Sequence, residues 1–127
     1  MTAPGRRRPR MTLTSTVLGT PDPRGLAQFY ADLLGWPIET DEPEWVTLRP
    51  GGPGLSFQLE PDHLPPTWPQ GPGDQQMQLH LDIRVDDLAA ATGLAQSLGA
   101  RIAALQPQDD VRVMLDPAGH PFCLYVV

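Results

Sequence analysis

Residues 22–36, DPRGLAQFYADLLGW, decide the fold, because a similar stretch, DDLAAATGLAQSLGA, returns at residues 86–100. In this comparison Asp22 matches Asp86, and Leu34-Gly35 matches Leu98-Gly99. Each copy follows a short strand-like segment and precedes several more. An internal duplication fixes the architecture before any single motif is considered. Two copies predict two similar modules packed together, with a cleft between or within them.

Each copy carries the start and stop signals of a helix. Asp22 is a good N-cap and Pro23 a good first helical residue. Gly35 is suited to end this helix, and we expect Asp86 to begin the second helix and Gly99 to end it. Apolar residues recur at helical spacing in the first copy, namely Leu26, Phe29, Tyr30, Leu33 and Leu34.

Strand-like segments surround the two helices in the same order. We expect strands at about 12–18, 37–41, 44–49 and 55–60 in the first half, and at about 78–85, 100–105, 111–115 and 121–127 in the second. Each half therefore reads β-α-β-β-β, and the expected class is α+β. Residues 11–127 form one domain in this interpretation, with module one at about 11–60, a connection at about 61–76 and module two at about 77–127.

The segment 78–85 alternates strictly between polar and apolar residues. Leu79, Leu81, Ile83 and Val85 point to one side of a strand, and Gln78, His80, Asp82 and Arg84 to the other. This alternation predicts a polar face on the first strand of module two.

Composition limits the classes of function. The chain has 127 residues and a net charge of −6, which argues against nucleic acid as the main partner. Four of its arginines lie in residues 1–10, which we interpret as a disordered basic tail, and either Met1 or Met11 is a candidate start. No apolar run is long enough to span a membrane. Cys123 is the single cysteine, and without an export signal we expect a cytoplasmic protein.

Three segments resemble the vicinal oxygen chelate superfamily, which includes glyoxalases, bleomycin resistance proteins and extradiol dioxygenases. Residues 29–36 resemble its "FY…LLGW" helix end, residues 80–88 its "HLDxxVDDL" strand and helix start, and residues 116–123 its "DPxGNxF" turn and last strand. The resemblance covers about residues 11–127 and is closest to compact glyoxalase-like proteins of bacteria. It implies two tandem βαβββ modules that form a curved mixed sheet around a shared pocket.

The resemblance also implies a set of metal ligands. Family members with a metal take ligands from the first and fourth strands of each module, and these positions correspond here to Ser15 (or Thr16), Gln58, His80 and Cys123. Such a site holds a divalent metal, here zinc, manganese, nickel or iron, for Lewis-acid chemistry. Only one of the four positions carries His and none carries Glu. The resemblance therefore does not identify a cofactor. Each of these residues is also compatible with a purely structural role, as pocket wall, strand residue or buried thiol.

Further residues complete the expected site. Glu60 lies two residues after Gln58 and is the candidate general base, with His80 as the second catalytic candidate. We expect a ligand to contact Gln58, Gln78, Asp82, Arg84, Trp36, Trp45 and Tyr125, and Arg84 is equally suited to pair with Asp82. His63 is expected to lie in a solvated loop, His120 to serve the last turn, and Trp68 to act as a lid or a dimer contact.

Three functions remain open at this point. The preferred one is a glyoxalase-like protein that binds a small molecule without the usual metal, for example to sequester a drug or metabolite, and that forms a homodimer. The alternative is a metal-dependent lyase, isomerase or dioxygenase with a rearranged ligand set centred on His80. A docking or accessory protein is a third and weaker reading.

Overall fold

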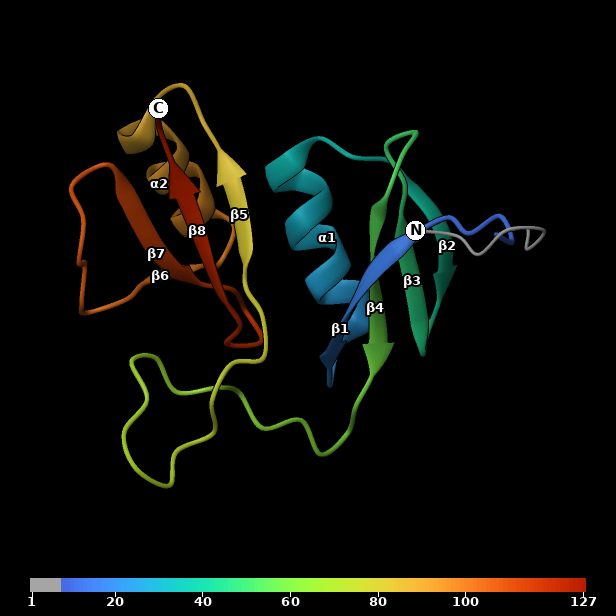
Figure 1. The fold of residues 1–127 in the computed structure, drawn as a ribbon, viewed down its shortest axis with the longest axis horizontal. Helices are drawn as coiled ribbons and strands as arrows, with labels where there is room; N and C mark the ends of the chain where they lie inside the picture. The colour runs from blue at the N-terminus through green and yellow to red at the C-terminus, as the bar shows by residue number, and fades with distance from the viewer. Residues whose placement is uncertain (1–7) are drawn as a thin grey trace.

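The protein folds as two β-α-β-β-β modules in tandem (Figure 1). The structure, a computed structural model, describes residues 8–127, so most of the expected basic tail lies outside the described residues. Module one contains β1 (Ser15–Thr20), α1 (Pro23–Leu34), β2 (Ile38–Glu42), β3 (Trp45–Leu48) and β4 (Gly54–Leu59). Module two contains β5 (Leu81–Arg84), α2 (Leu88–Ser97), β6 (Arg101–Ile102), β7 (Val111–Leu115) and β8 (Pro121–Tyr125). The α+β class and the order of elements are confirmed.

The capping signals place the helices correctly, with one exception. The Asp22 carboxylate accepts a hydrogen bond from the Gly25 N–H at 3.0 Å, and Gly35 closes α1 in the left-handed conformation with φ 69°. In module two the cap is Asp87, which accepts from the Ala90 N–H at 3.0 Å. The prediction of Asp86 was wrong by one residue, because the Val85 N–H still bonds to the Tyr125 carbonyl and keeps the chain extended past β5.

Each module forms its own mixed four-stranded sheet. Sheet A has the order β1-β4-β3-β2 and sheet B the order β5-β8-β7-β6. In both, the first strand runs parallel to the fourth and the other pairs are antiparallel. The identical order confirms the duplication seen in the sequence.

Helix α1 lies between the two sheets (Figure 1). The ring of Tyr30 stacks on Phe57 of β4, with centroids 5.8 Å apart, and meets Phe122 of β8 edge-on at 5.9 Å. All three rings are fully buried. Each such pair contributes about 0.5–1.5 kcal/mol beyond its buried area. A single aromatic core therefore joins the modules.

The position of α1 decides where each sheet's polar side chains point. Successive strand residues face opposite sides of a sheet. Because α1 contacts Phe57 and Phe122, their neighbours Gln58 and Cys123 lie on the far faces of sheets A and B. We call these far sides the outer faces. Within one chain the two outer faces point away from each other.

The connection between the modules, residues 60–80, contains no helix or strand and crosses the joint between them. It rests on the turn before β8, where the His63 Nε2 lies 2.9 Å from the Ala118 carbonyl oxygen. Pro65 packs against Gly119, which has φ 91°, and a Cβ at position 119 would lie 2.6 Å from the Pro65 Cβ. Only glycine fits this contact without strain. In the described range no helix combines the length and apolarity that crossing a bilayer requires.

Candidate functional site

The outer face of sheet B gathers most of the side chains expected in module two. The register places Asp82 opposite Cys123 and Arg84 opposite Tyr125, and His80 precedes Asp82 by one strand repeat. The alternation predicted from the sequence therefore holds over Leu81–Arg84, and the predicted strand at 78–85 was three residues too long at its start and one at its end. Leu79 departs from it, because it precedes β5 and is 51% exposed, whereas Leu81, Ile83 and Val85 pack against the core.

Three of these side chains form a polar cluster. The His80 Nε2 lies 3.1 Å from the Asp82 Oδ1, and one ligand atom from each of His80, Asp82 and Cys123 lies within 4.8 Å of the others. Burial, followed by the negative charge of Asp82 and its hydrogen bond, raises the pKa of the Cys123 thiol. Cys123 is therefore a neutral thiol near pH 7 and a weak nucleophile.

A small recess lies beside this cluster. It has a volume of about 180 Å³, and we call it the outer recess. The connection contributes Trp68 to its wall, and Val113 and Cys123 come from sheet B. The other lining residues are Met77, His80, Pro107, Gln108, Val111 and Pro121. An apolar wall with a few convergent polar groups is the usual composition of a small-molecule site.

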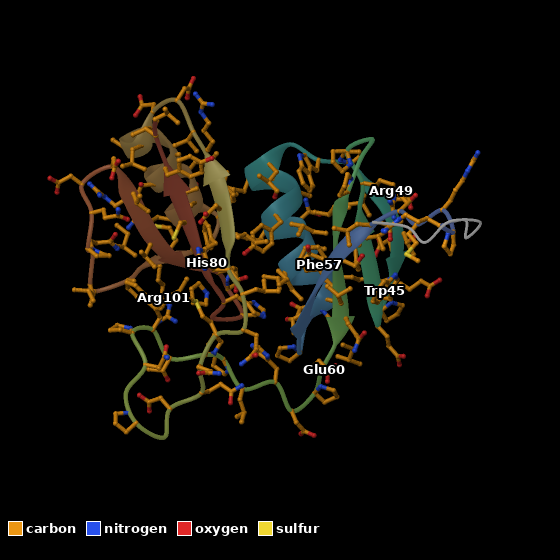
Figure 2. The ribbon with its side chains drawn as sticks, viewed as in Figure 1. Trp45, Arg49, Phe57, Glu60, His80 and Arg101 are labelled. Atoms are coloured by element: carbon orange, nitrogen blue, oxygen red, sulfur yellow. The ribbon has the colours of Figure 1, made fainter. Side chains whose placement is uncertain are left out.

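The residues expected from module one lie elsewhere. The Ser15 Oγ is 2.6 Å from the Ser56 Oγ, and the Gln58 amide donates to the Glu60 carboxylate at 2.7 Å. Trp45 lies opposite Gln58 in the register of β3 and β4. Figure 2 shows Trp45 and Glu60 well separated from His80. Within one chain these residues and the His80 cluster do not meet.

Three other expected ligand contacts also fall outside the outer recess. Trp36 follows α1 and packs, partly buried, against the core. Gln78 lines a different cavity, which lies between the modules. Arg84 borders a groove that residues of α1 and α2 also line. The Asp82 carboxylate contacts the His80 Nε2 at 3.1 Å in place of the Arg84 guanidinium.

The donor set on sheet B fits a metal ion chemically. An imidazole, a carboxylate and a thiolate are all ligands that zinc accepts, and three protein ligands leave a position open for a substrate oxygen. Ser15 and Gln58 belong to the other outer face and cannot join this set within one chain. Asp82, in β5 two residues after His80, supplies the third donor of this set.

Sequence reasoning missed the apolar side of the recess. Val111 and Val113 alternate with Arg112 along β7, so the predicted strand already implied that both lie on one face. The spacing alone did not show that this face also carries His80. The contact between the connection and sheet B, which brings in Trp68 and Met77, leaves no periodic signal in the sequence.

Two tandem βαβββ modules, with the first and fourth strands parallel and a polar cluster on the second sheet, define a glyoxalase-like protein. The sequence model of the glyoxalase-like domain matches residues 15–125. The chain therefore belongs to the glyoxalase-like domain family.

Solved structures show the same fold at low sequence identity. A glyoxalase/bleomycin resistance protein/dioxygenase family enzyme from Burkholderia phytofirmans PsJN is 18% identical, with a TM-score of 0.70 over 92% of this chain and 99% of that one. A glyoxalase-related enzyme from Fulvimarina pelagi is 18% identical, with a TM-score of 0.69 over 93% and 89% of the two chains. Lactoylglutathione lyase from Agrobacterium tumefaciens is 16% identical, with a TM-score of 0.59 over 94% and 96%. No curated protein sequence gives a significant match.

Proposed function

We propose that the protein binds a small, mainly apolar molecule in the outer recess and holds it without chemical change. The observation that carries this proposal is the recess itself, in which an indole and two valines face the imidazole of His80 and the thiol of Cys123. The polar groups fix the orientation of a ligand, and its apolar body supplies most of the affinity. The acidic chain favours neutral or cationic ligands through long-range steering. Sequestration of a drug or metabolite in the cytoplasm is the role that suits such a protein.

A thermal-shift screen of small aromatic and heterocyclic compounds tests this function. A compound that raises the melting temperature is then titrated by calorimetry into the Trp68→Ala variant and the Trp45→Ala variant. We expect Trp68→Ala to weaken binding at least tenfold, because it removes one wall of the recess. Trp45→Ala, on the outer face of sheet A, is the matched control. Equal effects of the two substitutions would place the ligand outside the recess of a single chain, either elsewhere or between the outer faces of two copies.

A metal-dependent reaction is the second candidate, and the cluster of His80, Asp82 and Cys123 favours it. A divalent ion held there would supply Lewis acidity to a substrate oxygen. The test is to offer zinc, manganese, nickel and iron(II) separately to protein purified without chelators. Elemental analysis then measures how much metal each sample retains. Metal at one equivalent that is lost in His80→Ala would establish this candidate. Absence of metal after all four additions would exclude it.

We also propose that the chain acts as a homodimer. The outer faces point in opposite directions within one chain, so only a second copy can place Gln58 or Glu60 of one sheet opposite His80 of another. Light scattering coupled to size exclusion at several concentrations gives the mass. A monomer at all concentrations would restrict the site to the residues of module two.

A further inference from the structure

All three histidines of the chain line a single cavity between the modules. The chain contains 3 His, and His63, His80 and His120 all border this cavity, whose volume is about 240 Å³. We call it the histidine cavity. It lies under the connection, where the end of β1, the ring of Tyr30 and the turn before β8 meet. It shares a wall, formed by Met77, His80 and Pro121, with the outer recess.

The ring of His120 is held by a buried carboxylate. The His120 Nδ1 lies 2.9 Å from the Oδ2 and 3.1 Å from the Oδ1 of Asp116, whose side chain is fully buried. Asp116 also accepts from the Tyr30 hydroxyl at 2.8 Å and from the N–H groups of Ala118 and His120. A carboxylate surrounded by donors only accepts, so the His120 Nδ1 carries the proton. The Nε2 of the neutral ring is then left as a lone-pair acceptor.

The other two histidines also direct one ring nitrogen at an oxygen of the protein. The His63 Nε2 lies 2.9 Å from the Ala118 carbonyl oxygen, and the His80 Nε2 lies 3.1 Å from the Asp82 Oδ1. Both nitrogens face acceptors and therefore donate. In its neutral form each ring uses its only N–H on the protein and keeps one acceptor nitrogen. The cavity is rich in acceptors for hydrogen bonds from a ligand.

The rest of the lining is apolar or amide, apart from Tyr30, whose hydroxyl is bonded to Asp116, and it contains no charged residue. Three of its apolar side chains are exposed in the free protein: Val17 at 45%, Leu64 at 69% and Leu79 at 51%. A ligand that covers them gains about 25 cal/mol for each Å² of apolar surface removed from water. An anionic ligand is disfavoured, because the lining offers it no Lys or Arg side chain.

From these contacts we infer that the histidine cavity is a second ligand site, for a small uncharged hydroxylated molecule of the phenol class. The hydroxyl donates to the Nε2 of His120, and the hydrocarbon ring packs on Val17, Leu64 and Leu79. Asp116 positions His120 by fixing its tautomer and ring orientation. This site is separate from the outer recess and does not depend on the function proposed for it.

The test uses the full chain at pH 7.5 with phenol as the probe and toluene as the probe without a hydroxyl. Titrations are followed by amide chemical shifts, where Leu18 and Leu64 report the histidine cavity, and Val113 and Trp68 report the outer recess. We expect phenol to shift the first pair at lower concentration than the second, and toluene to bind at least tenfold more weakly. Tenfold corresponds to about 1.4 kcal/mol, the contribution of one hydrogen bond.

A pair of variants locates the acceptor. His120→Asn retains a donor toward Asp116 but lacks the Nε2 acceptor, and we expect it to weaken phenol binding about tenfold. Gln70→Asn, an exposed change in the connection that lines neither cavity, is the control. Equal binding of phenol and toluene to the native chain would overturn the proposal without any variant. So would phenol shifts confined to Val113 and Trp68, or binding of acetate in place of phenol.

Discussion

The hydroxyl of Tyr30 is the residue-scale feature on which both modules depend. It donates across the joint between the modules to the buried Asp116, which in turn orients His120. From its sequence, Tyr30 was predicted only as part of an apolar helix face, and Asp116 only as a turn residue. Spacing reveals which face of a helix is buried. It does not reveal which buried residue from the other module will meet a polar atom on that face.

Tyr30→Phe removes this hydroxyl and leaves the ring in place. Because a hydrogen bond to a charged group contributes about 1.5–3 kcal/mol, we expect the free energy of unfolding to fall by about 2 kcal/mol. Urea titration followed by circular dichroism measures the change. Tyr125→Phe, on a partly buried tyrosine of the outer face, is the matched control and should cost less than about 0.5 kcal/mol. Similar losses in the two variants would contradict a special role for Tyr30.

The same residue predicts a pH dependence. Burial, then the charge of Asp116 and its hydrogen bond, raise the pKa of Tyr30 well above its ordinary value of 10.0. The folded chain keeps this proton at pH values where the unfolded chain loses it. The resulting stability is therefore complete below about pH 10 and is lost as the pH rises toward the folded pKa.

Urea titrations between pH 8 and pH 11 measure this effect. We expect the stability difference between the native chain and Tyr30→Phe to shrink above about pH 10, by up to about 1.4 kcal/mol for each pH unit. A difference that stays constant across the range would show that the hydroxyl does not hold its proton in this way.

At the scale of elements, the helix caps show where the duplication predicts the structure and where local hydrogen bonds determine it. Aligning the two copies pairs Asp22 with Asp86, and both Asp86 and Asp87 have the right chemistry for a cap. The backbone bond from Val85 to Tyr125 extends the strand and passes the role to Asp87. The alignment of the two copies therefore predicted the start of α2 to within one residue. The bond between Val85 and Tyr125 determines which of the two Asp residues caps the helix.

This assignment is testable with adjacent substitutions. Asp87→Ala removes the acceptor for the Ala90 N–H and should destabilise the protein by about 1 kcal/mol. Asp86→Ala changes an exposed neighbour of the same type and should change stability by less than about 0.5 kcal/mol. Thermal unfolding of both variants at the same pH gives the comparison. A larger loss from Asp86→Ala would return the cap to the residue that the repeat predicted.

At the scale of the whole molecule, the sequence predicted the modules, their order and the polar faces of their strands. It did not predict how one module sits on the other. That arrangement depends on Tyr30, Phe57 and Phe122, three aromatic residues from different elements with no shared period. As a consequence, Gln58 and Asp82 were correctly assigned to strands, whereas His80 lies just before β5 and Glu60 just after β4. The sequence did not show that Gln58 and His80 would face in opposite directions.

The shared aromatic core predicts that both modules unfold together. Phe122→Ala removes a fully buried ring that contacts Phe29 and Tyr30 of α1, and we expect a loss of about 3–5 kcal/mol. Hydrogen exchange of amides in β4 and in β8 should accelerate by similar factors in this variant. Acceleration confined to module two would show that the modules unfold independently.

The separation of the two outer faces also bears on how such a chain diverges over generations. The two outer faces are built from different strands. A substitution that abolishes chemistry on sheet A therefore leaves the cluster on sheet B in place. The inner face of sheet A still supports α1, and selection for folding preserves that half after its own chemistry is gone. A duplicated module can thus survive as scaffold while its twin acquires a new specificity.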